Sequence, residues 1–176
     1  MRAVLDACVL YPTVLREVLL GVAARGDFVP LWSARILEEW RRAAARAGED
    51  VARQAGVEIA LAGEAFPAAC VEVPVRDDLW LPDPDDVHVL AAALEGGAEF
   101  IVTANLRDFP PRAMAGHGVQ AVAPDAFLLD LHHERSVAAE VEAVRARTEA
   151  ISGREQPLRP LLKRAGLPRL AKALSQ

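Results

Sequence analysis

The sequence lacks several features that would place it in other protein classes. No apolar run in its 176 residues reaches the roughly 18 to 20 residues of a membrane-spanning helix. Asp6 interrupts the first apolar stretch, so the N-terminus does not resemble a secretory signal. Only two cysteines are present, Cys8 and Cys70, and they form neither a disulfide framework nor a Cys-x-x-Cys metal motif. We therefore expect a cytoplasmic protein that does not bind a membrane, with two buried thiols.

Composition and charge indicate a globular protein with an uneven charge distribution. Hydrophobic residues make up 52% and charged residues 26% of the chain, which is enough apolar material for one folded core. Residues 151–176 carry six basic residues against one acidic residue, a net charge of +5. Residues 1–150 carry 14 basic and 24 acidic residues, a net charge of −10. An acidic body of this kind needs a cation or a basic surface before it can bind a polyanion.

The chain is predicted to divide into a main domain, residues 1–150, and a basic helical C-terminal appendage, residues 151–176. Proline residues interrupt the appendage, which predicts one or two short helices. Its basic side chains could contact an RNA backbone or an acidic partner. Its leucines could equally pack on the main domain as the apolar face of an amphipathic helix. These leucines are Leu161, Leu162, Leu167, Leu170 and Leu174.

Apolar runs and capping residues alternate along the chain in a way that predicts an α/β fold. Strands are expected over residues 3–10, 28–32, 70–75, 98–103 and 120–122. Helices are expected over residues 14–25, 33–47, 49–65, 84–96 and 124–150. Most of the strands are continuous apolar runs, which is typical of strands buried on both faces. We therefore predict a three-layer α/β/α architecture around a central, mainly parallel sheet.

Acidic residues gather where these strands end or helices begin. The clusters are Asp6; Glu38 and Glu39; Asp83, Asp85 and Asp86; and Asp108, which follows Asn105. Ligands of parallel α/β sheets bind at the carboxyl ends of the strands, where these clusters can converge. Carboxylates brought together need a positive partner, and oxygen-only ligand sets suit Mg²⁺ or Mn²⁺. The pattern predicts a metal site that could polarise a water molecule for attack on a phosphodiester.

Each cluster also has a purely structural interpretation. Asp83, Asp85 and Asp86 can stabilise the start of a helix by capping and by interaction with its dipole. Adjacent helical residues point in different directions, so one member of the Glu38–Glu39 pair is expected to be solvated. Asp108 could be an ordinary turn residue. Asp6 is the most informative acid, because a carboxylate within an apolar strand is costly without a function.

Four blocks of sequence resemble the PIN-domain family of metal-dependent ribonucleases. The blocks are residues 4–12, 32–40, 83–93 and 101–110, and the similarity covers roughly residues 1–130. The Asp-Pro-Asp-Asp segment, residues 83–86, is similar to a bacterial subgroup described as VapC-like toxin ribonucleases. The resemblance implies an endoribonuclease that uses Mg²⁺ or Mn²⁺. It also implies the toxin role in a type II toxin–antitoxin pair, with an antitoxin partner and a homodimeric state.

The resemblance also assigns roles to individual residues. The implied catalytic residues are Asp6, Glu39, Asp86 and Asp108. The implied metal ligands are Asp6, Asp86, Asp108, Asn105 and, in reserve, Asp83. The implied substrate-binding residues are Thr103, which could instead be only a strand residue, and Cys8.

Two positions depart from the family pattern. Asn105 stands where the family usually has an aspartate, and an amide oxygen ligates a cation with less charge. Cys8 stands where the family usually has a small polar residue, and a thiol is a weak hydrogen-bond donor. The alternative hypothesis is therefore a degenerate PIN-fold binding module with little or no nuclease activity.

Three tryptophans and one histidine remain outside these assignments. Trp32, Trp40 and Trp80 have apolar neighbours, so we expect them to pack in the core or a dimer interface rather than stack on bases. His88 follows the Asp-Pro-Asp-Asp segment and could aid proton transfer. It is expected instead to be a partly exposed helical residue.

Overall fold

A five-stranded, all-parallel sheet forms the centre of the protein in a computed structural model that describes residues 1–175. The strand order is β3-β2-β1-β4-β5, and every neighbouring pair is parallel. The strands are β1 Arg2–Leu5, β2 Val29–Ser33, β3 Cys70–Val71, β4 Phe100–Val102 and β5 Gln120–Val122. This arrangement confirms the predicted α/β fold with a parallel sheet.

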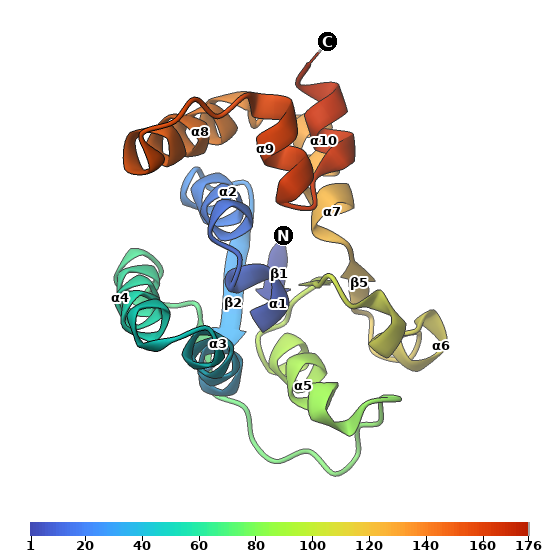
Figure 1. The fold of residues 1–176 in the computed structure, drawn as a ribbon. Coiled ribbons are helices and arrows are strands. Elements are labelled where there is room, and N and C mark those ends of the chain that lie inside the picture. The colour runs from blue at the N-terminus through green and yellow to red at the C-terminus, as the bar shows by residue number, and fades with distance from the viewer. Residues whose placement is uncertain (176) are drawn as a thin grey trace.

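Helices cover the sheet and complete the layered architecture. They are α1 Ala7–Leu10, α2 Thr13–Ala24, α3 Ala34–Arg46, α4 Glu49–Ala65, α5 Val87–Glu95, α6 Pro111–Met114, α7 Pro124–Glu134, α8 Ala138–Ser152, α9 Leu158–Arg164 and α10 Pro168–Ala173. Two short 3₁₀ helices, η1 Pro84–Asp86 and η2 Leu106–Asp108, precede α5 and α6. Figure 1 shows α3 and α4 on one side of the sheet and α5 and α6 on the other. Within residues 1–175, no helix has the length and apolarity needed to cross a bilayer.

The centre of the core lies on β1, between two strands that are also apolar. Val4 pairs with Leu31 of β2 and Ile101 of β4, and these three side chains are 4% exposed or less. A strand flanked by strands and covered by helices on both faces must be apolar at every position, which explains the continuous Val- and Leu-rich runs. This burial fixes the register of β1 against β4, and with it the position of the residues that follow each strand.

Three predicted strands are shorter in the structure than expected, and one of them, predicted over residues 98–103, spans only Phe100–Val102. The strand predicted over residues 3–10 ends at Leu5, because the chain turns at Asp6 into α1. The Asp6 carbonyl accepts hydrogen bonds from the backbone N–H groups of Val9 and Leu10, which begins that helix. The strand predicted over residues 70–75 pairs only at residues 70 and 71, at the edge of the sheet. Pro74 has no N–H to donate to a ladder, which disfavours further pairing.

Most of the helix predictions are confirmed, and one is wrong. The predicted helices 14–25, 33–47 and 49–65 match α2, α3 and α4 within one or two residues. The single helix predicted over residues 124–150 is wrong, because residues 135–137 separate α7 from α8. Arg135 there is extended, and the His132 Nδ1 atom accepts a hydrogen bond from the Val137 N–H. Helix α6 was not predicted from the sequence.

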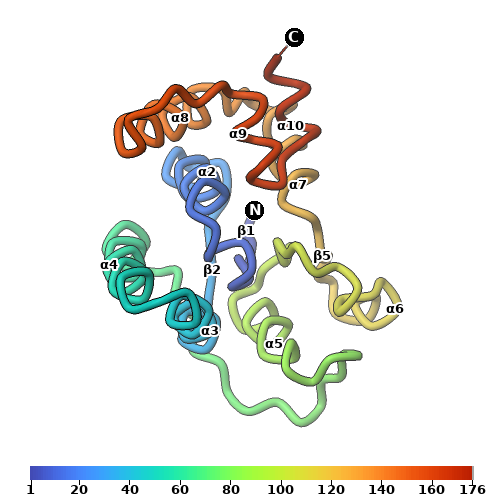
Figure 2. Tube along the Cα trace, viewed as in Figure 1, coloured from blue at the N-terminus to red at the C-terminus, as the bar shows by residue number. Residues whose placement is uncertain are grey.

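The C-terminal segment packs on the rest of the protein through its leucines. Leu162, Leu167 and Leu170 are fully buried and belong to the same apolar cluster as the strands. The trace in Figure 2 runs from α8 through α9 to α10, which lies against α7. The amphipathic packing interpretation is therefore confirmed, whereas the domain boundary near residue 150 stays a prediction.

Some burial predictions are wrong. Trp32 and Trp40 are 1% exposed and lie in the core, as expected. Trp80 is 69% exposed and therefore lies outside the core, so its placement in a dimer interface stays a prediction. Trp80 lies in an irregular segment before η1, where no element covers it. Cys8 and Cys70 are both exposed rather than buried. Cys8 lies just after the end of β1, and Cys70 begins the edge strand β3. Their apolar neighbours in the sequence therefore do not enclose either side chain.

Candidate metal centre

Asp6 and Thr103 lie side by side because they follow two paired strands. Leu5 of β1 pairs with Val102 of β4, so the next residue of each strand emerges at the same edge. The Thr103 hydroxyl donates to Asp6 Oδ2 over 2.7 Å and accepts the Asn105 backbone N–H over 3.1 Å. Asp6 is 7% exposed and Thr103 is fully buried. The hydroxyl therefore holds one oxygen of a buried carboxylate in a fixed direction.

Cys8 completes this small hydrogen-bonded group. Its Sγ donates to Asp6 Oδ2 over 3.1 Å and lies 3.4 Å from Thr103 Oγ1, and the Ala104 N–H donates to the sulfur over 3.3 Å. Although part of the residue is exposed, its sulfur packs against Asp6 and Thr103, and this local desolvation together with the charge of Asp6 raises the pKa of Cys8 to about 12. At neutral pH the side chain is therefore a thiol that donates to Asp6, and not a reactive thiolate.

Three further carboxylates converge beside Asp6. One oxygen each of Asp83, Asp86 and Asp108 lies within 4.8 Å of the others. Asp83 and Asp86 stand at the start and end of η1, and Asp108 ends η2, so residues far apart in the sequence meet here. Asp83 also caps η1, because its Oδ1 accepts the Asp85 N–H over 2.9 Å. The capping interpretation and the site interpretation therefore both hold for Asp83, since a carboxylate has further lone pairs.

The pKa of Asp86 is raised by its surroundings in this cluster. Partial burial raises it to about 6, and the charges of Asp6, Asp108 and Asp83 add to the effect. A carboxylate surrounded by three others is therefore poorly compensated by the protein itself. A hard divalent cation bound by oxygen atoms would provide the missing positive charge. The carboxylate oxygens of Asp83, Asp86 and Asp108 suit a hard divalent cation and do not resemble a zinc site, because no thiolate or imidazole belongs to the group.

Asn105 is engaged on both sides of its amide. Its Nδ2 donates to Asp108 Oδ2, and its Oδ1 accepts a hydrogen bond from Arg107 Nε over 3.2 Å. Arg107 also lies 3.6 Å from Asp108 Oδ1. In this arrangement Asn105 orients Asp108 rather than presenting a free carbonyl oxygen. Its predicted role as a metal ligand stays a prediction.

Glu39 contacts two basic side chains, Arg35 and His88. Its Oε1 is 2.8 Å from His88 Nε2 and 3.4 Å from Arg35 Nε. Burial would raise the pKa of Glu39, but the contact with His88 and the charge of Arg35 outweigh it and hold the pKa below its usual value. Glu38 instead faces solvent and pairs with Arg42, which agrees with the prediction that one member of the pair is solvated.

Arg35 is a residue near Glu39 that sequence reasoning missed, and His88 is one that it named for proton transfer but expected to be partly exposed. His88 is 8% exposed, so its expected placement on a partly exposed helix surface is wrong. Nothing in the sequence links it to Glu39, which lies 49 positions earlier. Arg35 did carry a signal, because it precedes Glu39 by four residues in a predicted helix.

The structure brings most of the predicted site residues to one edge of the sheet. Asp6, Cys8 and Thr103 form one hydrogen-bonded group, and Asp83, Asp86 and Asp108 form the adjoining carboxylate group. The charge of Asp6 contributes to the raised pKa of Asp86, which links the two groups. Glu39 lies apart from both groups and contacts Arg35 and His88 instead.

Comparison with known proteins agrees with this geometry. The model of the PIN domain family matches residues 2–107, which is more than half of the chain. A 45-residue stretch is 53% identical to a Mycobacterium tuberculosis protein named "Putative ribonuclease VapC50". That stretch covers 26% of this chain and 27% of the relative, so the chain matches about a quarter of the relative's length. No solved structure gives a significant match. On the strength of the match over residues 2–107, the chain belongs to the PIN domain family.

Proposed function

We propose that this protein is a divalent-metal-dependent endoribonuclease that hydrolyses RNA phosphodiester bonds. The observation that carries the proposal is the convergence of Asp83, Asp86 and Asp108 within 4.8 Å, beside the buried carboxylate of Asp6. The relative's name supports a ribonuclease rather than another hydrolase. The uncompensated charge indicates that this part of the protein works with a cation.

In the proposed site, Asp6, Asp86 and Asp108 hold Mg²⁺ or Mn²⁺, with Asp83 as an additional ligand. When bound, such a cation lowers the pKa of water and stabilises negative charge on phosphate oxygens. Thr103 and Cys8 hold the Asp6 carboxylate in its direction through their hydrogen bonds. Asn105 holds Asp108 in the same way.

Glu39 has a separate proposed role at the margin of the site. It is ionised at neutral pH, because its pKa lies below the usual value for a glutamate. An ionised carboxylate at this place can accept a proton from an attacking water molecule or orient that molecule. Arg35 and His88 hold the Glu39 side chain from two sides, which limits its rotation.

The test is cleavage of a structured, end-labelled RNA by the purified protein with Mn²⁺ or Mg²⁺. Parallel reactions contain EDTA, an Asp6→Asn variant, or a His133→Phe variant as the matched control, since His133 is exposed on α7. We expect cleavage by the wild type and the control only. The products should carry 5′-phosphate ends, because water rather than the ribose 2′-hydroxyl attacks.

Two results would contradict the proposal. Products with 2′,3′-cyclic phosphate ends would show that the ribose hydroxyl attacks and that water activation is not required. A folded wild type that binds Mn²⁺ but cleaves no RNA would favour the alternative, a degenerate PIN-fold binding module. Cleavage that persists in Asp6→Asn would place the active site elsewhere.

The relative's name also supports a role as the toxin of a type II toxin–antitoxin pair. In this proposal the protein acts in the cytoplasm, forms a homodimer and is inhibited by an antitoxin protein. Induced expression in a bacterial host should arrest growth, and Asp6→Asn should relieve the arrest. Light scattering of the purified protein at several concentrations tests the homodimer, and equal growth with both versions would argue against the toxin role.

A further inference from the structure

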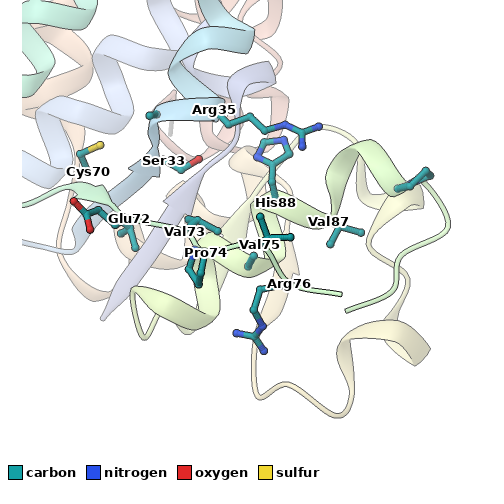
Figure 3. Close-up of a pocket in the computed structure, with 14 residues that line it drawn as sticks. Ser33, Arg35, Cys70, Glu72, Val73, Pro74, Val75, Arg76, Val87 and His88 are labelled. Carbon is teal, nitrogen blue, oxygen red and sulfur yellow. The ribbon is translucent and has the colours of Figure 1, made fainter. Parts of the chain in front are cut away.

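A cavity of about 760 Å³ opens beside the carboxylate cluster and has no role in the site described above. Figure 3 shows the segment that begins at Cys70 passing along one side of it and α5 on the other. Its walls are mostly aliphatic, with Val71, Val73 and Ala91 among the lining residues. Pro84 and Val87 also line it, and they flank Asp86 in the sequence. The cavity therefore adjoins the proposed metal centre.

The one buried imidazole of this region lines the cavity and lacks a hydrogen-bond partner. His88 is 8% exposed, and neither of its ring nitrogens makes a hydrogen bond within residues 1–175. Its Nε2 lies in close contact with Glu39 Oε1, at 2.8 Å, whereas its Nδ1 has no partner at all. Buried polar atoms are nearly always hydrogen-bonded in folded proteins, and an unpaired one indicates an absent partner.

Arg35 lies between this cavity and the metal centre. It lines the cavity, and its Nη2 donates to the Asp85 carbonyl over 3.1 Å. Figure 3 shows the His88 ring projecting from α5 toward the Arg35 side chain at the rim. Arg35 contacts the carboxylates of Glu39 and Asp85 but remains about half exposed, so part of its guanidinium group stays open to a ligand that enters the cavity. The cavity therefore offers apolar walls, one open imidazole and one accessible guanidinium group.

We propose that this cavity binds one unstacked nucleobase of the RNA, next to the phosphate that is cleaved. Single-stranded RNA is recognised through splayed-out bases that stack on arginine planes and form hydrogen bonds along their edges. The aliphatic walls enclose the faces of the base, His88 pairs with a polar atom on its edge, and Arg35 stacks on the base or contacts the adjoining phosphate. The proposal rests on the proposed ribonuclease function and adds a preferred nucleotide at one position beside the cut.

The occupant is RNA rather than a peptide segment of a partner protein for two reasons. Arg35 places an exposed positive charge at the side of the cavity next to the centre where a phosphate would be bound, which suits a polyanionic strand. The acidic lining residue Glu72 lies at the Cys70 end, away from Arg35 (Figure 3). Arg76, the other basic residue of the lining, already pairs with Asp78 and Glu95. An apolar peptide side chain would fill the aliphatic walls but would leave the His88 nitrogens unpaired.

The test measures binding of the four free ribonucleosides in EDTA, so that neither metal nor cleavage is needed. Ligand-observed NMR and calorimetry give the dissociation constant for each. We expect at least one nucleoside to bind the wild type and the His133→Phe control equally. His88→Phe removes the imidazole nitrogens and should weaken that binding about fivefold or more. Ala91→Leu fills the cavity and should abolish it, which provides a second test if His88→Phe does not fold.

The outcomes separate this inference from the proposed function. No nucleoside binding by the folded wild type, or equal binding by both cavity variants, would overturn the inference even if the protein cleaves RNA. Nucleoside binding that is lost in the variants would support it even if no RNA is cleaved. Where cleavage occurs, sequencing of the cut ends should show one preferred nucleotide beside the cut. His88→Phe should flatten that preference, and an unchanged preference would contradict the inference.

Discussion

The ionised carboxylate of Asp86, a proposed metal ligand, is expected to destabilise the metal-free protein. Partial burial and the charges of three other carboxylates raise its pKa to about 6, from 3.8 for an unperturbed aspartate. The difference corresponds to ~3 kcal/mol for a fully buried group, which solvent screening at this partly exposed residue reduces to ~1 kcal/mol. We expect Asp86→Asn to stabilise the protein by about that amount at pH 7 in EDTA. Urea unfolding measures it, and a destabilised variant would contradict the electrostatic account.

The same shift predicts a pH dependence of stability in the absence of metal. Because the pKa of Asp86 is raised in the folded state, its contribution to the free energy of unfolding is fully present below about pH 4. This contribution is lost as the pH rises through about 6. The free energy of unfolding of the wild type, relative to Asp86→Asn, should therefore fall between these values and then stay constant. A difference that does not change with pH would show that the cluster does not act on Asp86.

Cys8 tests whether a departure from the family pattern impairs the site. Its thiol donates to Asp6, and its raised pKa keeps it protonated, so it acts as a hydrogen-bond donor. Cys8→Ser supplies a stronger donor and should cleave RNA as fast as the wild type or faster. Cys8→Ala removes the donor and should slow cleavage by about threefold to tenfold. Single-turnover rates with Mn²⁺ distinguish the two, and equal rates for both variants would show that the donor has no role.

The sequence indicated the carboxylates of the site better than their neighbours. Asp6 could be recognised because a charge in an apolar strand needs a partner, and the strand pairing then fixed Thr103 beside it. The contact between Glu39 and His88 joins residues of two helices and depends on how α3 and α5 pack. Single-sequence patterns carry no such information.

Helix α10 depends on a side chain from another element. Asp125 of α7 is 8% exposed, and its two carboxylate oxygens accept the backbone N–H groups of Arg169 and Leu170. Asp125→Ala leaves one buried and one partly buried N–H donor without a partner and should lower the free energy of unfolding by ~2 kcal/mol. Asp130→Ala, at an exposed position on the same helix, is the matched control and should change it by less than about 0.5 kcal/mol. Equal effects in urea unfolding would contradict this assignment.

Elements were predictable where a local signal marks their ends. The prediction for α3 succeeded because Ser33 caps it, accepting the Ile36 N–H over 3.3 Å. The break between α7 and α8 was missed because no proline or glycine marks residues 135–137. There the chain is redirected by tertiary burial of Val137, which is fully buried. Such breaks follow from packing, which the periodicity of one segment does not reveal.

The whole molecule places its basic C-terminal segment away from its acidic site. Figure 1 shows α9 and α10 near the N-terminus, where β1 begins, whereas the site lies where the strands end. We expect a double variant, Arg159→Gln with Lys163→Gln, to change the RNA cleavage rate by less than about twofold, since both residues are exposed there. The dependence of RNA binding on salt should also stay unchanged. If the variant reduces the slope of the logarithm of the RNA-binding constant against the logarithm of salt concentration by about one to two units, this segment contacts the RNA backbone.

The most direct test of the central claim is a calorimetric titration of the protein with Mn²⁺ at pH 7. The account predicts that the wild type binds the ion and that Asp86→Asn binds it at least tenfold more weakly, although this variant is the more stable protein in EDTA. Affinity should also fall as the pH is lowered through about 6, because protonated Asp86 cannot act as a ligand. Equal Mn²⁺ affinity in the two proteins would contradict the claim that these carboxylates form a metal centre.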